Sequence, residues 1–195
     1  MRRLLLILGL ILASSSLWAQ NQKFESVKGK PDYWGKIDVV VRESYGSELY
    51  TAKISTPDYW GEVRIDYVDR SGYRAGYSMV RKADYWGEVK VEHFDKSGRR
   101  QGSSTIKKAD YWGVVIVEHR DSSGRLLLRS KCNKPDYWGE VKIEHYDASG
   151  YRVGVSIKGK VDYWGSQRVE HSFDSDWTTD NIALLYIMTV EYSPY

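Results

Sequence analysis

The four histidines of the chain occupy one position of an internal repeat: His93, His119, His145 and His171 follow one another at intervals of 26 residues. Imidazole rings can bind metal ions, and with a reference pKa of ~6.5 they can also sense pH. Metal binding needs a solenoid, in which equivalent residues lie ~4.8 Å apart, whereas in a hairpin meander they lie on the order of 10 Å apart. The simpler interpretation is that each ring is half buried and ends an apolar row with a hydrogen bond.

Tyr-Trp pairs are the second candidate for chemistry. They belong to the motif Asp-Tyr-Trp-Gly, which begins at residues 32, 58, 84, 110, 136 and 162. Aromatic faces in a row can bind sugar rings or an extended polymer, and repeated contacts add avidity. Alternatively, each tryptophan packs against its neighbour and covers an apolar face. The candidate ligand-binding residues are Tyr33, Trp34, Tyr59, Trp60, Tyr85, Trp86, Tyr111, Trp112, Tyr137, Trp138, Tyr163 and Trp164.

The other repeated motif, Asp-x-Ser-Gly, begins at Asp69, Asp95, Asp121 and Asp147. Each copy supplies a single acid, whereas a calcium loop needs several oxygen ligands. The chain also has no glycine-rich phosphate loop, no metal-spaced His and Cys cluster and no nucleophile beside a base. We therefore expect a protein that is not an enzyme and has no cofactor.

The segments between these motifs have the pattern of β-strands. Residues 88–94 alternate polar and apolar side chains with a period of two, which is typical of a half-buried strand. Asp-x-Ser-Gly supplies turn residues, and proline precedes three copies of Asp-Tyr-Trp-Gly, which also fits a turn. The six repeats therefore predict an all-β antiparallel meander of six 26-residue hairpins. A parallel β-solenoid is the main alternative.

Such a meander must bury one of its faces. One face of the first strands carries Val, Ile and the histidines, and the other face is charged. Because a single sheet has no second layer to cover the apolar face, we expect a curved sheet, a closed one, or burial against a partner. Gly76, Gly102 and Gly154 share one position in the second strand, where they are predicted to make room for an aromatic ring such as the repeat tryptophan.

The ends of the chain depart from the repeat. Residues 1–19 contain two arginines, a short apolar run and a final Ala19, which predicts a secretory signal peptide cleaved after this alanine. Residues 20–31 are interpreted as a polar N-terminal lead, residues 32–171 as the six-repeat β domain and residues 172–195 as a C-terminal cap. The cap holds an apolar stretch that could be a helix capped by Thr179 or Asp180, or a terminal strand; we favour the helix.

The charge balance limits the partners. Cleavage removes Arg2 and Arg3, so the 29 basic residues of the full chain become 27, against 26 acidic residues. A nearly neutral chain lacks the basic stripe that nucleic acid binding requires. The second strands are too polar on both faces to meet lipid, so we do not expect the mature chain to span a membrane.

The outline Trp-Gly, strand, Asp-x-x-Gly, strand resembles bacterial secreted β-hairpin repeat proteins. It is similar to the Trp-Gly repeat, to the tyrosine-aspartate (YD-type) repeats through His-Tyr-Asp-Ala-Ser-Gly at residues 145–150 and, more distantly, to the MORN-type repeats. The resemblance covers residues 32 to about 171 and implies sheets that form surfaces and shells, with no reaction. The leader ending in Trp-Ala-Gln looks bacterial and indicates a secreted or periplasmic protein of a Gram-negative organism.

We therefore expect a binding or scaffold module. Its expected ligand is a polysaccharide, or another extended polymer, along the Tyr-Trp ladder. One alternative is a cell-surface protein partner or self-association through the Val and His face. A second is metal binding by the histidine row if the fold is a solenoid.

Overall fold

The computed structural model describes residues 22–43 and 46–174. These residues form antiparallel β-strands and no helix, so none of them belongs to a helix long and apolar enough to cross a membrane. The strands are β1 (Gln22–Lys28), β2 (Ile37–Glu43), β3 (Glu48–Ile54), β4 (Val63–Asp69), β5 (Arg74–Val80), β6 (Val89–Asp95), β7 (Arg100–Ile106), β8 (Val115–Asp121), β9 (Leu126–Cys132), β10 (Val141–Asp147), β11 (Arg152–Val161) and β12 (Gln167–Phe173).

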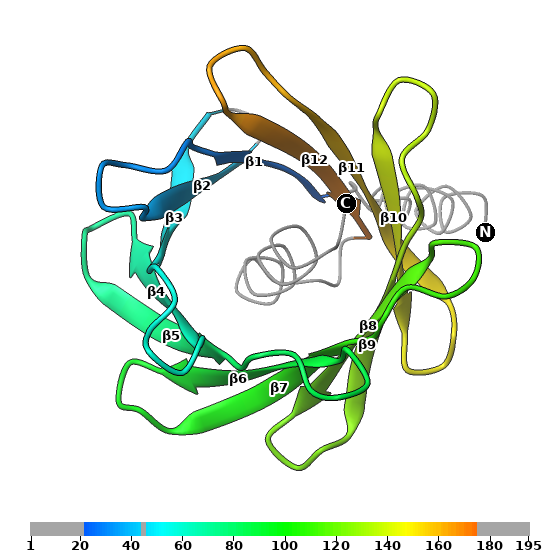
Figure 1. Ribbon diagram of the computed structural model, residues 1–195, viewed down its shortest axis with the longest axis horizontal. Helices are drawn as coiled ribbons and strands as arrows, with labels where there is room; N and C mark the ends of the chain where they lie inside the picture. The colour runs from blue at the N-terminus through cyan, green and yellow to red at the C-terminus, as the bar shows by residue number, and fades with distance from the viewer. Residues whose placement is uncertain (1–21, 44–45, 175–195) are drawn as a thin grey trace, which may run out of the picture.

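The strands close into a barrel (Figure 1). Each strand pairs with the next one in sequence, and β1 pairs with β12 to complete the ring. The prediction of an all-β antiparallel meander of hairpins is confirmed, and closure is the way in which the sheet covers its apolar face. The solenoid is excluded, because all neighbouring strands in the ring are antiparallel.

The closing strand, β1, comes from the segment interpreted as an N-terminal lead. Ser26 of β1 lies opposite Val169 of β12, in the register by which Ser156 of β11 lies opposite Ile143 of β10. β1 is therefore the second strand of the sixth hairpin, supplied from the other end of the chain. A signal for this is present in the sequence, because a serine stands six residues before Asp-Tyr-Trp-Gly in β1, as it does in β5, β7, β9 and β11.

The other end of the repeat domain lies slightly beyond its predicted limit. β12 runs to Phe173, two residues into the predicted C-terminal cap. The remainder of the cap from residue 175 onwards, including the predicted helix, lies outside the described residues, as does the predicted signal peptide.

The inner face of the barrel carries the apolar core. Side chains alternate along each strand between this buried face and a more exposed outer face. One repeat position contributes a fully buried aliphatic side chain from every even-numbered strand. These residues are Val39, Ile65, Val91, Val117, Ile143 and Val169.

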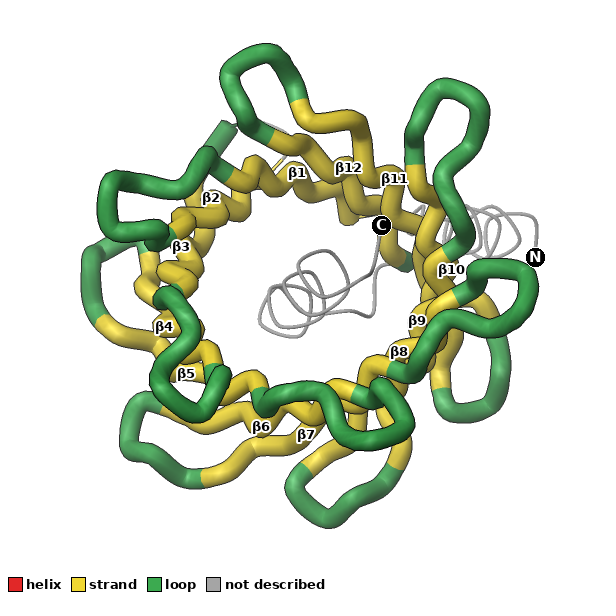
Figure 2. Tube along the Cα trace, viewed as in Figure 1, coloured by secondary structure: helices red, strands yellow, loops and turns green. Residues whose placement is uncertain are grey.

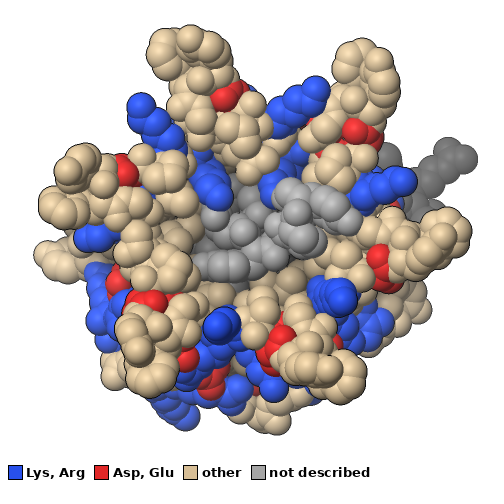
Figure 3. Space-filling model, in the orientation of Figure 1, with Lys and Arg blue, Asp and Glu red and all other residues tan. Residues whose placement is uncertain are grey.

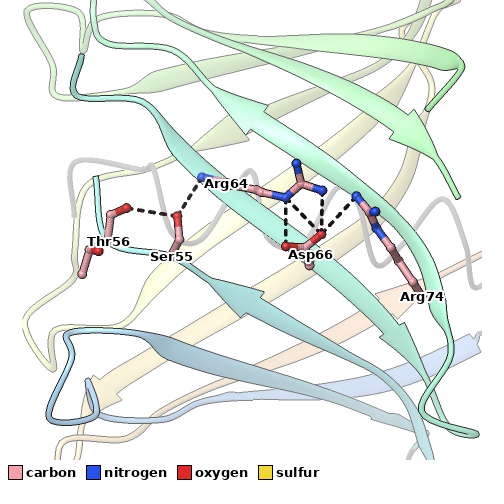
Figure 4. Close-up of polar contacts among 5 residues, drawn as sticks. All are labelled: Ser55, Thr56, Arg64, Asp66 and Arg74. Carbon is pink, nitrogen blue, oxygen red and sulfur yellow. Dashed lines mark hydrogen bonds and ion pairs between the residues drawn. The ribbon is translucent and has the colours of Figure 1, made fainter. Parts of the chain in front are cut away.

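The outer wall carries charged side chains that pair across strands (Figure 4). Asp66 of β4 accepts hydrogen bonds from Arg64 and forms an ion pair with Arg74 of β5 at 3.2 Å. Beside this cluster, the Ser55 hydroxyl accepts from the Arg64 backbone N–H and donates to the Thr56 carbonyl, both at 3.0 Å. The ion-paired side chains are more than a third exposed, so each pair contributes at most ~1 kcal/mol.

The glycines of the second strands allow a close approach of the neighbouring strand. A Cβ atom on Gly76 or Gly102 would overlap a backbone carbonyl oxygen of the next strand. At Gly154 the group in the way is the ring of Phe173. An aromatic neighbour is thus found at one of the three glycines, and the prediction of a repeat tryptophan at this position is wrong.

Candidate functional site

Each Asp-Tyr-Trp-Gly motif forms the tight turn between two hairpins. In the first copy, the Asp32 carboxylate accepts from the backbone N–H groups of Trp34 and Lys36, both at 2.8 Å. The Gly35 N–H donates to the Asp32 carbonyl, and Gly35 has a φ of 77°, in the left-handed region that favours glycine. The other five copies repeat these side-chain and backbone hydrogen bonds at 2.8–3.0 Å.

These six turns lie at the same end of the barrel. In an up-and-down meander every connection from an odd strand to the following even strand reverses at the same edge, and all six motifs are connections of this kind. Figure 2 shows the turns that connect the strands, in green, arranged around the whole ring. We call the six Tyr-Trp pairs in these turns the aromatic crown.

The side chains of the aromatic crown are strongly exposed. The tyrosines are 91–93 % exposed and the tryptophans 68–75 %. Within each pair the two rings meet edge to face, with centroids 5.2–5.4 Å apart and planes at 85–88°. The alternative in which each tryptophan covers the apolar face is therefore wrong, because that face lies inside the barrel while the crown projects from its rim.

Charged side chains of both signs lie among the turns (Figure 3). A lysine stands two residues before the motif in five of the six copies, and Lys82 and Lys108 lie beside the turn glycines Gly61 and Gly87. Every copy contains its own aspartate, and three copies add a glutamate directly after the glycine. Over the seven residues from two before each motif to one after it, acids outnumber bases by nine to six, and Arg81 and Lys107 stand one residue before this window. The acids are Asp32, Asp58, Asp84, Asp110, Asp136, Asp162, Glu62, Glu88 and Glu140, and the bases are Lys30, Lys36, Lys82, Lys108, Lys134 and Lys160.

The predicted histidine row lies on the inner face, as part of a hydrogen-bonded chain. Each histidine shares hydrogen bonds with a serine hydroxyl on either side; for His93 the Nδ1 atom pairs with Ser78 and the Nε2 atom with Ser104, both at 2.7 Å. Among the described residues, nine hydrogen bonds of 2.5–3.5 Å connect the chain from β4 round to β1. The members in order are Tyr67, Ser78, His93, Ser104, His119, Ser130, His145, Ser156, His171 and Ser26.

Burial lowers the pKa of all four histidines. The pKa of His93 falls to about 4, with the charge of Arg100 adding to the effect of burial, and burial lowers the pKa of His145 to about 3. The pKa values of His119 and His171 also lie well below 6.5, through burial and then through neighbouring histidines. Each ring is therefore neutral at pH 7, with one nitrogen to donate and one to accept, as a chain of alternating serine and histidine requires. The histidines of the folded protein are therefore not expected to change their charge near pH ~6.5, the reference pKa of histidine.

The histidine row does not have the geometry of a metal site. A serine stands between successive histidines, and within residues 22–43 and 46–174 no group of three or more His, Cys, Asp or Glu side chains could hold a metal ion. The solenoid on which the metal alternative depended is not the fold. The histidines and the central Val and Ile residues of this face are buried inside the barrel, while Ile37, Val63 and Val89 near the rim are partly buried, so a partner could reach most of the face only if the barrel opened.

Sequence reasoning did not identify the other members of this chain. The serines stand at a fixed position six residues before five of the six motifs, and this periodicity was a usable signal. Tyr67 takes the place of a histidine in the second repeat and donates to, or accepts from, Ser78 at 2.7 Å. Val41 and Ala52 take the equivalent places on β2 and β3, where they interrupt the ring of hydrogen bonds.

Comparisons with known proteins identify no relative. A scan against protein-family models, a search of curated proteins and a search of solved structures each find no match to the chain. The resemblance to Trp-Gly, tyrosine-aspartate and MORN-type repeats therefore stays a prediction, and the functional argument depends on the geometry of the chain.

Proposed function

We propose that the protein is a non-enzymatic binding module, secreted or periplasmic, and that its aromatic crown binds polysaccharide. The observation that carries the proposal is the exposure of the six Tyr-Trp pairs at one rim. Because these aromatic side chains are exposed, the fold lacks the stabilisation that their burial would give, about 25 cal/mol for each Å² of apolar surface. An exposed apolar surface of this kind marks an interaction site more often than a structural feature.

The chemistry of the aromatic crown favours sugar rings. The faces of Trp and Tyr offer flat apolar surface, and the tyrosine hydroxyl and indole N–H add polar groups at the same place. Acids and bases are nearly balanced around the turns, so the aromatic crown lacks the basic excess on which the binding of nucleic acid and other polyanions depends. An uncharged polysaccharide fits both properties.

A cell-surface protein is the second candidate partner, at the same surface. Tyr and Trp are enriched among the residues that dominate protein interfaces, and the aromatic crown exposes both. Self-association through the Val and His face is not supported, because those residues are buried.

The double variant Trp86→Ala/Trp112→Ala tests the proposal. Its matched control is Tyr73→Ala/Tyr151→Ala, which removes two side chains of equal exposure, 74 %, from the opposite rim. Binding to a panel of neutral polysaccharides, soluble ones in affinity gels and insoluble ones by depletion from solution, should be at least tenfold weaker for the Trp variant, while the control should bind like the wild type. If the Trp variant binds as tightly as the wild type, or if the wild type binds neither a soluble nor an insoluble polysaccharide, the proposal is wrong. Binding of the wild type to extracted surface protein alone would favour the second candidate.

A further inference from the structure

The tips of the aromatic crown lie in one plane. The repeats keep the same strand register within and between hairpins, apart from one extra bulged pair, Val161 with Gln167, beside the sixth turn, and the ring closes after six repeats because β1 completes the last hairpin. Successive repeats in a closed ring must be related by a rotation about the barrel axis. A translation along the axis at each repeat would add up, and the last repeat could not meet the first. Equivalent side chains therefore lie on a circle perpendicular to the barrel axis.

The same symmetry sets the directions of the six pairs. Each Tyr-Trp pair is turned by about 60°, a sixth of a full turn, relative to the next pair. The local geometry of the pairs does not change around the circle, as their uniform centroid distances and plane angles show. A single extended polymer can follow one arc of this circle but not all of it, so it would contact two or three pairs.

We infer that the ligand of the aromatic crown is the flat face of an insoluble neutral polysaccharide, in which parallel chains present sugar rings in a plane, and not a single soluble chain. This inference rests on the proposed function and specifies its ligand. A plane is the shape that meets all six pairs at once. Six weak contacts on a rigid ring then act together, and avidity of this kind raises affinity by roughly 100-fold or more over that of one contact.

Two triple variants with the same number of substitutions distinguish a surface from a chain. The alternating variant carries Trp34→Ala, Trp86→Ala and Trp138→Ala, and leaves three pairs evenly spaced around the ring. The contiguous variant carries Trp86→Ala, Trp112→Ala and Trp138→Ala, and leaves three adjacent pairs. The second alternating set, Trp60→Ala, Trp112→Ala and Trp164→Ala, serves as an independent copy of the first if the first does not fold.

The measurement is binding of the full-length mature protein to microcrystalline cellulose and to chitin, by depletion from solution, and to the soluble hexasaccharides of the same sugars. We expect the wild type to bind one of the insoluble polymers at least tenfold more tightly than its hexasaccharide. We expect the alternating variant to bind that polymer as tightly as the contiguous variant or more tightly, because three spaced contacts hold a plane against tilting.

The reverse order overturns the inference while leaving the proposed function in place. If the hexasaccharide binds as tightly as the polymer, and the alternating variant loses on the order of 10-fold more affinity than the contiguous one, the ligand is a single chain along an arc. If the wild type binds neither form, the proposed function itself fails for these sugars and the inference fails with it. Binding to vesicles of neutral phosphatidylcholine with the same affinity as to the polymers would identify a lipid surface and would also overturn the inference.

Discussion

The two rims of the barrel are formed by the same turn but display different side chains. In the second repeat, Asp58 at the crown accepts from the backbone N–H groups of residues 60 and 62, and Asp69 at the opposite rim accepts from those of residues 71 and 73, all at 2.9 Å. Both turns end in a glycine with positive φ, 78° at Gly61 and 81° at Gly72. The turn is thus stabilised by its aspartate and its glycine, and it does not depend on the two residues between them.

The central residues of the opposite rim show what the turn itself tolerates. The position that tyrosine fills throughout the crown is filled there by Arg70, Lys96, Ser122 and Ala148, and serine stands where the crown has tryptophan. The hydrogen bonds are nevertheless unchanged. Because the turn can be built without aromatic side chains, the six Tyr-Trp pairs are better explained by what the crown contacts than by what the fold requires.

The largest expected effect of a single substitution is in the wall between the rims, which this comparison holds responsible for stability. His145→Ala removes a ring that is 2 % exposed and hydrogen-bonded to Ser130 and Ser156, both at 2.8 Å. The resulting cavity and the two hydroxyls that lose this partner should cost about 3–5 kcal/mol in the free energy of unfolding, measured by urea unfolding with circular dichroism. The control, Lys142→Ala on the outer wall, should cost under ~1 kcal/mol. A loss at His145 as small as that of the control would show that the inner chain does not support the barrel.

The same inner chain should make stability depend on pH. The folded-state pKa values of the histidines lie below the unfolded value of ~6.5, so the unfolded chain binds more protons as the pH falls. Stability should be level above about pH 6.5 and decline below it, continuing towards pH 4 for His93, by up to ~1.4 kcal/mol per pH unit for each histidine. Urea midpoints measured between pH 8 and 5 test this mostly above the range in which carboxylates titrate. A flat profile would mean that the rings are not buried neutral.

Substitution of the two aspartates of one repeat tests whether the turns at both rims are stabilised in the same way. Asp58→Ala and Asp69→Ala each remove a carboxylate that accepts two backbone hydrogen bonds. Each substitution should cost about 1–2 kcal/mol, and the two values should agree within the error of urea unfolding. A much larger cost at Asp58 would indicate that the crown turn has a structural role that the opposite rim lacks.

The smallest expected effect is that of a single exposed aromatic residue at either rim. Trp60 and Tyr73 are equally exposed, at 74 %, and each lies in the turn of an aspartate just compared. Trp60→Ala and Tyr73→Ala should each change the free energy of unfolding by less than about 0.5 kcal/mol. If Trp60→Ala alone lowered the free energy of unfolding by more than ~2 kcal/mol, the aromatic crown would have a structural role.

The fold could be predicted from the sequence because local signals agreed with one another. Period-two alternation in residues 88–94 and the Asp-x-x-Gly turns both indicate hairpins, and a 26-residue repeat copies them along the chain. The closure of the sheet into a barrel could not be predicted from local signals, because it depends on pairing between strands that are far apart in the sequence. The pairing of β1 with β12 joins residues from opposite ends of the repeat domain.

The surroundings of the candidate residues could be predicted only in part, for a similar reason. The crown residues and the histidines were identified by position, but their exposure depends on which face closes inward. Sequence reasoning did not place Ser104 between His93 and His119, because the three residues are on different strands and their contact depends on register. Likewise Gly102 was assigned an aromatic neighbour, when the nearest group is a backbone carbonyl. Contacts between strands follow from register, which a single strand does not specify.

The most direct test of the central claim is urea unfolding of a variant in which every crown tryptophan is replaced by alanine, followed by circular dichroism. The substituted residues are Trp34, Trp60, Trp86, Trp112, Trp138 and Trp164. If the aromatic crown serves binding and not folding, the variant should unfold in one cooperative transition with the wild-type dependence on urea, and should no longer bind polysaccharide. Loss of the cooperative transition would contradict this account, because it would show that the barrel needs the crown to fold.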